Sequence, residues 1–304
     1  MPASLVLILA LIGISFAGPL VRLSTAHPLT IAIWRLAFSL VIIGVFLIAT
    51  GGWRQWKRLD RRGLLAAVGA GVMLAVHFWS WNASIRFTTI SASVVLVNLQ
   101  PAIVAVLSVV WLKEPPTRRQ WVGLAMAMAG AVVIALPDFG QQVRSAAPNP
   151  VLGDLLAVIG AITAAIYFVV GRRLRATLDL WPYVSLVYGS CLIILIGFAV
   201  AVRAPVMGLP PREMMIFAAL AIGPMLLGHT GLNWALKYLP AYVVNLTLLG
   251  EPVGATVLAA ALPGIRELPT LVTLSGGSMI LAGVYVTARK GRIAAPSAVD
   301  ALRD

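Results

Sequence analysis

The chain has 304 residues, of which 60% are hydrophobic and only 11% are charged. This composition excludes an ordinary soluble domain and indicates a protein that crosses the membrane several times. A formal net charge of +13 would suggest a nucleic-acid partner in a soluble chain. Here the basic residues fall between apolar runs, so they act first as topology signals, and we expect no nucleic acid.

Ten apolar runs are long enough to cross the hydrocarbon core of a bilayer, which takes about 20 helical residues. In chain order they cover 4–22, 29–49, 63–85, 89–112, 119–136, 151–171, 181–202, 213–236, 241–262 and 270–288. The first run lacks the basic region that opens a signal peptide, so we expect it to be retained. The predicted fold class is an all-α membrane protein with ten transmembrane helices.

Lysine and arginine residues gather on one side of these runs. They cluster at 54–62, 113–119 and 172–175, after the second, fourth and sixth runs, and again in the tail beyond 289. The opposite connections carry only scattered arginines. Because basic residues stay on the cytoplasmic side, we expect both termini in the cytoplasm and the chain in the plasma membrane, which is the inner membrane of a bacterium.

The two halves of the sequence repeat each other at a nearly constant spacing. Matching positions are Asn82 and Asn233, Arg86 and Lys237, Phe87 and Tyr238, Pro101 and Pro252, Glu114 and Glu267, Gly123 and Gly276, and Gly130 and Gly283. Each half has five runs, so the second lies upside down relative to the first. Inverted repeats are typical of transporters, with the site at the repeat interface. A duplication without a transport role is the alternative.

These repeats give the predicted domain boundaries. Residues 1–137 form the first five-run repeat, 138–150 a linker, 151–289 the second, inverted repeat, and 290–304 a cytoplasmic tail. We expect runs three, four, eight and nine to line a central cavity, because they carry most of the unusual polar and aromatic residues.

Glu251 is the only carboxylate deep inside an apolar run. A charge at bilayer depth costs roughly 3 kcal/mol or more, which indicates a functional or paired group. Pro252 removes a backbone hydrogen bond and predicts a hinge, as Pro101 does in the first half. Glu251 can couple transport to protons or pair with a cationic amine, with Thr247 one turn earlier and Gln100 as its repeat mate. A structural carboxylate hydrogen-bonded at the kink is the alternative.

Aromatic, imidazole and amide groups recur on runs three and eight. His77 and Trp81 share a helix face, as do His229 and Asn233, because each pair is four residues apart. Asn82 and Trp234 follow directly in the chain. Such groups suit a cavity for a small amphipathic or aromatic metabolite, or for a cationic head. Hydrogen bonding between helices is the alternative.

A metal or cofactor is not expected. Two histidines without a third ligand make a weak metal signal, and the single cysteine, Cys191, allows no cysteine cluster or internal disulfide. The sequence also has no Gly-x-x-x-x-Gly-Lys loop for nucleotide phosphates.

Several further polar or small residues have two interpretations each. Asn98 and Asn245 line a cavity or join helices. Arg35, about two turns into the second run, snorkels outward or caps an unwound segment. We expect a structural or gating role, with contact to the substrate as the alternative. Glu114 is expected to pair with a nearby arginine. Gly123 begins a stripe of small residues that permits close packing within the bundle or across a dimer.

The whole pattern resembles the drug/metabolite transporter superfamily, in its EamA-type branch of ten-span exporters. The resemblance is carried by Ser91-Ala92-Ser93, Pro101, Trp111-Leu112-Lys113-Glu114-Pro115, Leu249-Gly250-Glu251-Pro252-Val253, Arg266-Glu267-Leu268-Pro269, and Pro28 with Arg35. Lys113-Glu114 and Arg266-Glu267 depart from the family's usual Gly-Glu, so we expect those helix ends to be shaped differently.

The function predicted is export of small metabolites, such as amino acids or amines, by alternating access with or without proton coupling. The alternatives are an uncoupled facilitator, or a membrane scaffold or receptor without transport. An enzyme is not expected, because the histidines lack a nucleophile or metal motif. The predicted partners are a small-molecule substrate and the lipid bilayer, and the chain is expected as a monomer or homodimer.

Overall fold

The computed structural model describes residues 2–88, 90–135, 148–261 and 271–288. Within these ranges the chain is helical and contains no strand. Seven stretches of the described chain are long and apolar enough to cross a membrane, namely Ala3–Val21, Pro28–Ala49, Arg61–Phe87, Val95–Leu112, Pro150–Thr177, Leu180–Ala201 and Pro211–Ala235. The chain is therefore an all-helical, multi-pass membrane protein.

The helices follow one another in two series. The first holds α1 (Ala3–Ser15), α2 (Ala17–Leu23), α3 (Pro28–Ala49), a 3₁₀ turn (Gly52–Arg58), α4 (Arg61–Phe87), α5 (Ile90–Val97), α6 (Gln100–Leu107), a π turn (Ser108–Leu112) and α7 (Arg118–Ala135). The second holds α9 (Pro150–Thr177), α10 (Leu180–Ala201), α11 (Pro211–Leu220), a π-helical stretch (Ala221–Thr230), α12 (Gly231–Ala235), α13 (Ala241–Leu246), a 3₁₀ turn (Thr247–Gly250), α14 (Glu251–Ala261) and α15 (Leu271–Ala288).

Part of the predicted architecture stays a prediction. Helices α7 and α15 cover the runs expected at 119–136 and 270–288, and α13 and α14 divide the run expected at 241–262. None of these three runs is among the seven apolar stretches, so the structure does not by itself give ten spans. Most of the expected linker at 138–150, the tail at 290–304 and Glu267 lie outside the described residues. Helix α5 is placed, but the side chain of Ser91 lies outside the description.

Three of the long helices begin with a local signal in the sequence. The side chain of His27 accepts a hydrogen bond from the amide of Leu29 at the start of α3. Asp60 accepts one from Gly63 at the start of α4, at 2.7 Å. Asn149 caps α9 in the same way. Each cap satisfies an amide that the first turn of a helix leaves without a partner, so the boundaries follow from the sequence.

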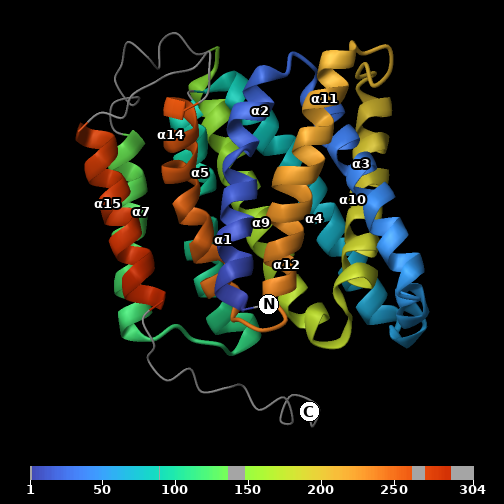
Figure 1. Ribbon diagram of the computed structural model, residues 1–304, viewed down its shortest axis with the longest axis horizontal. Coiled ribbons are helices and arrows are strands. Elements are labelled where there is room, and N and C mark those ends of the chain that lie inside the picture. The colour runs from blue at the N-terminus through green and yellow to red at the C-terminus, as the bar shows by residue number, and fades with distance from the viewer. Residues whose placement is uncertain (1, 89, 136–147, 262–270, 289–304) are drawn as a thin grey trace.

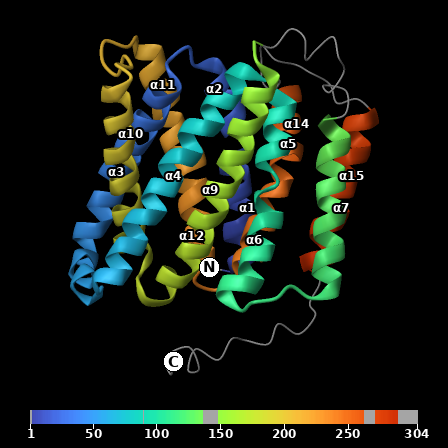
Figure 2. The same cartoon turned by 180° about the vertical axis from the view of Figure 1, so that it is seen from behind.

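The helices form one bundle (Figures 1 and 2). Helices α1, α4, α9 and α12 lie in the middle, α3 and α10 lie at one edge, and α7 and α15 lie side by side at the other edge. Helix α4 packs along both α9 and α10, and α1 packs against the π-helical stretch and α12, so the two halves of the chain interlock. Helix α1 begins and α15 ends at the same end of the bundle (Figure 1).

Two helical runs are interrupted just before their prolines. Helix α5 ends at Val97, and α6 starts at Gln100 with Pro101 in its first turn. In the second half, a 3₁₀ turn separates α13 from α14, which starts at Glu251 with Pro252 next. Proline lacks the amide that would continue the helix, so each run loosens at this point. The first residue after each break is the polar one, Gln100 or Glu251.

Lys113 is the C-cap residue of the π turn after α6. It stands where the resembled family has glycine, and it adopts φ 58°, the left-handed conformation that glycine favours. The amide of Glu114 then bonds the carbonyl of Ser108, at 3.0 Å. The backbone turn at the end of this run is therefore the one that suits glycine, and the lysine bears the strain.

Candidate functional site

A narrow cavity of about 50 Å³ lies where the interrupted runs meet the middle helices. It is lined from α1, α2, α3, α4, α9, both interrupted runs and the π-helical stretch. The lining residues are Ile14, Ala17, Arg35, His77, Phe78, Trp81, Val97, Asn98, Gln100, Pro101, Phe168, His229, Leu248 and Glu251. Eight of these were singled out from the sequence, so the structure brings most of the predicted site residues together.

Glu251 and Gln100 occupy equivalent places on the cavity wall. Each is the first residue of a helix that starts after a break, and each precedes a proline. The Gln100 amide donates a hydrogen bond to the side-chain oxygen of Asn245, and Asn245 donates to the carbonyl of Ala241, at 2.9 Å. Gln100 is thus held by a neighbouring amide. Glu251 places an ionisable group on the opposite half of the same cavity.

His77 and His229 both line the cavity, with ring centroids 6.3 Å apart and the rings edge to face. Nδ1 of His77 lies 2.9 Å from the carbonyl oxygen of Gly160, which orients its ring. The ring is also parallel to that of Trp81 at 6.5 Å. His229 packs edge-on against Phe78 at 5.3 Å. The two imidazoles therefore belong to an aromatic wall, and no metal-binding cluster occurs in the described chain.

Arg35 does not snorkel to the surface. Its side chain is 1% exposed and points into the bundle, where its guanidinium lies 4.3 Å over the ring of Phe78. Its Nη2 approaches the sulfur of Met225 at 3.7 Å, which is a weak acceptor. This arrangement rules out the outward-snorkelling interpretation, and it puts the positive charge of Arg35 on the wall of the cavity that Glu251 also lines.

Three buried nitrogens on the cavity wall have no hydrogen-bond partner among the described residues. They are Nε of Arg35, Nε1 of Trp81 and Nδ1 of His229. Buried polar groups in folded proteins nearly always have a partner, since leaving one unpaired costs about 1–3 kcal/mol. The wall of this cavity therefore carries several polar groups without a hydrogen-bond partner in the described chain.

Five of the predicted site residues lie away from the cavity lining. Asn82 donates to the carbonyl of Pro28, at 3.3 Å. Trp234 packs against Tyr238, with ring centroids 4.5 Å apart. Thr247 and Pro252 also are not lining residues. The fifth, Asn233, is described next.

Asn233 is the centre of a buried network. Its amide donates to the hydroxyls of Tyr167 and Tyr188 and to the carbonyl of His229, the last at 2.7 Å. These bonds explain why the four-residue spacing from His229 does not bring Asn233 to the cavity. Its amide is held by tyrosines of α9 and α10. The sequence alone did not show that these two helices would lie next to Asn233.

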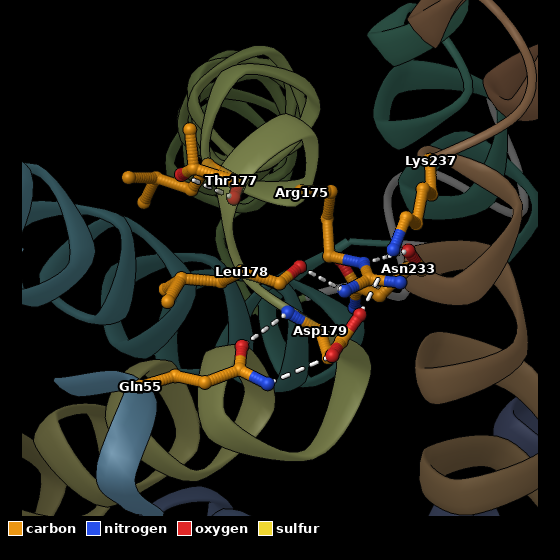
Figure 3. A network of polar contacts seen from close by, with 8 residues as sticks. Gln55, Arg175, Thr177, Leu178, Asp179, Asn233 and Lys237 are labelled. Carbon is orange, nitrogen blue, oxygen red and sulfur yellow. Dashed lines mark hydrogen bonds and ion pairs between the residues drawn. The ribbon is translucent and has the colours of Figure 1, made fainter. Parts of the chain in front are cut away.

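A second polar network lies at one end of the bundle, where α9, α10 and α12 meet the 3₁₀ turn after α3 (Figure 3). Asp179 accepts from Lys237 at 2.8 Å and from Gln55 at 2.7 Å. Arg175, only 2% exposed, donates to the carbonyls of Asn233 and Leu178. Lys237 and then Gln55 hold the pKa of the Asp179 carboxyl below its ordinary value by hydrogen bonding to its charged form.

The sequence marked Arg175 as a topology signal and Lys237 as the repeat match of Arg86, and it did not single out Asp179. The available signal was the position of Asp179 just before the apolar run of α10. Phe78 and Phe168, which line the cavity, were also missed, because an aromatic residue in an apolar run is most often a packing residue. Glu114 pairs with an arginine, as expected. The arginine is Arg172, whose Nη2 lies 2.8 Å from Oε1 of Glu114.

Comparison with known proteins places the chain among transporters. It is 27% identical over 281 residues to an uncharacterized transporter of Archaeoglobus fulgidus, covering 91% of this chain and 95% of that protein. It is 25% identical to the uncharacterized transporter YdfC of Bacillus subtilis, covering 92% and 88%. Its fold matches a protein of known crystal structure with a TM-score of 0.77, covering 94% of this chain and 96% of that chain at 18% identity.

The family match covers both halves of the chain. The profile that describes the EamA-like transporter family matches residues 1–136 and 151–289. These segments include every residue of the cavity wall. The chain belongs to the EamA-like transporter family and is a transporter rather than an enzyme.

Proposed function

We propose that the protein exports a small metabolite, such as an amino acid or an amine, from the cytoplasm by alternating access. The observation that carries this proposal is the cavity, which combines Arg35, Glu251 and aromatic rings with buried nitrogens that lack partners. Such a wall suits an organic molecule with an apolar body and a charged group. An apolar channel for water or gas would not need these buried charges.

Alternating access is supported by the size of the cavity and by the broken helices around it. About 50 Å³ is far less than the roughly 300–1,000 Å³ of pockets that enclose small molecules. A substrate therefore needs the walls to move apart. The interruptions before Pro101 and Pro252 are the natural hinges for that movement, because the helix ladder is already broken there.

The wider architecture is part of the same proposal. We infer ten spans in two inverted repeats, at 1–137 and 151–289, with both termini in the cytoplasm and the chain in the plasma membrane as a monomer or homodimer. The interlocking of α1 with α12, and of α4 with α9, supports a site shared by the two halves. Inverted repeats support movement of one part of the bundle against the other around a fixed site.

Proton coupling would run through Glu251. This carboxylate lies on the wall of the cavity, so a proton and a substrate can compete for it or bind together. Uncoupled facilitation is the second candidate. It is favoured by Arg35 on the same wall, since a neighbouring positive charge stabilises an ionised carboxylate and so opposes its protonation.

The test is flux of amino acids and aromatic amines into or out of proteoliposomes, with and without a pH gradient. Wild type, Glu251→Gln and the control Asp60→Asn are compared. Asp60 is an exposed carboxylate that caps α4, and asparagine caps a helix equally well. Flux driven by a pH gradient in wild type and control, but not in Glu251→Gln, would support coupling. Equal flux in all three, whatever the gradient, would support a facilitator. No flux with any substrate would refute the proposal.

A further inference from the structure

Arg35 lies at a depth where a cation needs an anionic partner. It is seven residues beyond the first residue of α3, which is about 10 Å along the helix axis. Its side chain is 1% exposed. In the described chain its guanidinium contacts the face of the Phe78 ring and the sulfur of Met225, and its Nε has no hydrogen-bond partner. A ring face and a thioether are weak compensation for five N–H donors and a full charge.

The groups that surround Arg35 offer one carboxylate. Helix α14 contributes Glu251, α4 contributes His77, and the π-helical stretch contributes His229. Helix α10 contributes Tyr188 and Cys191, which are ordinarily neutral. Among the residues that the structure describes, no direct ion pair joins Arg35 and Glu251. A small anion that enters the cavity therefore meets a guanidinium with donors to spare.

We propose that Arg35 binds the carboxylate of the transported molecule, so that the substrate is an organic acid or an amino acid rather than a simple amine. This inference rests on the proposed transport function and narrows its substrate class. A planar guanidinium matches a carboxylate with two parallel hydrogen bonds, which fixes the orientation of the ligand as well as binding it. The rings of Phe78, Trp81 and Phe168 then face the apolar body of the molecule.

The arrangement also gives a sign for the pH dependence of binding. A substrate carboxylate bound to Arg35 neutralises the positive charge that would otherwise stabilise ionised Glu251. The same carboxylate also repels the ionised form of Glu251. Binding of an acid is therefore accompanied by protonation of Glu251. A molecule with only an ammonium group behaves in the opposite way, since it pairs with ionised Glu251 and competes with the proton.

Three probes that share one ring separate these possibilities. They are phenylalanine, 3-phenylpropionate, which has only the carboxylate, and phenethylamine, which has only the ammonium group. Binding to the purified full-length protein is measured by calorimetry between pH 6 and 8, which requires no transport. We expect wild type to bind both carboxylate probes, and 3-phenylpropionate to bind more tightly as the pH falls.

The variants are Arg35→Gln, Arg35→Lys and the control Arg86→Gln. Arg86 is an exposed arginine at the end of α4, away from the cavity. Arg35→Gln should weaken the binding of both carboxylate probes about tenfold or more. Arg35→Lys should restore part of the affinity, because the lysine ammonium supplies a point charge but not the two parallel hydrogen bonds. Arg86→Gln should bind as wild type does. The pH series on wild type tests the inference even if Arg35→Gln does not fold.

The outcomes separate this inference from the proposed function. Carboxylate probes that bind Arg35→Gln as tightly as wild type would overturn it. So would wild type that binds neither carboxylate probe, or 3-phenylpropionate binding that weakens as the pH falls. If phenethylamine alone binds and is transported, the transport proposal stands and the role of Arg35 falls. If the carboxylate probes bind through Arg35 but never cross the vesicle membrane, the binding role stands and export fails.

Discussion

Replacing Gly283 by alanine should separate α7 from α15. A Cβ atom at position 283 would lie 2.5 Å from the carbonyl oxygen of Gly123 and 2.6 Å from the amide nitrogen of Ala127. Both neighbours are backbone atoms of α7, so no side chain can turn aside to make room. The two helices must move apart to a normal contact distance, and the close packing of their backbones would be lost.

The cost of this change can be bounded from the packing. Inserting one methyl group into a well-packed contact costs about 1–3 kcal/mol. Helices α7 and α15 lie at the edge of the bundle and contact each other far more than they contact the other helices (Figures 1 and 2). The strain therefore falls on this pair, and we expect the lower half of that range, with a drop in melting temperature of roughly 2–6 °C.

The assay is thermal unfolding in detergent, followed by intrinsic fluorescence. The control is Gly197→Ala in α10, where a Cβ atom would meet nothing within 4 Å. Alanine is also the better helix former, so this variant should be neutral or slightly more stable. A Gly283→Ala protein as stable as Gly197→Ala would refute the packing argument. It would show that the two helices do not meet at this distance.

Two further changes test the network at the end of the bundle and the turn after α6. Asp179→Asn should lower stability at pH 7 by well under 1 kcal/mol, because the contact of Asp179 with Lys237 is largely exposed. Since the pKa of Asp179 is lowered in the folded protein, its contribution is present above the ordinary carboxyl value and lost below about pH 4. Melting curves of the two proteins should therefore converge in acid, and a gap that widens in acid would contradict this sign. Lys113→Gly should raise stability by about 1 kcal/mol by relieving the left-handed strain at an exposed position, and a lower melting temperature would show that the lysine side chain makes a needed contact.

The sequence predicted the helices and the breaks in them well, for a physical reason. Apolar runs of about 20 residues have few alternatives to a helix in lipid, because every backbone amide must be bonded within its own segment. The breaks before Pro101 and Pro252 followed from the missing proline amide. The stripe of small residues that starts at Gly123 packs on α15 of the same chain. Of its two interpretations, this is close packing within the bundle.

The site was predicted less completely, because helical periodicity gives a shared face without saying what the face meets. His77 and Trp81 share a face of α4 and both line the cavity. His229 and Asn233 have the same spacing, yet the amide of Asn233 is bonded to tyrosines of α9 and α10. The direction of Arg35 could not be read either, since a long side chain can reach lipid headgroups or the core from the same position.

The repeat gains its functional meaning where the two halves differ. Gln100 and Glu251 are equivalent in the repeat, and Asn245 satisfies the amide of Gln100. The position in the first half that corresponds to Asn245 is Val94, which has no polar side-chain atom. A valine cannot give Glu251 the amide that Gln100 has. At this pair of positions the first half therefore presents a fixed, neutral amide to the cavity, and the second half presents a group that can ionise. A transport cycle that responds to protons or to charged substrates needs only one such group, and Arg35 of the first half lines the same cavity.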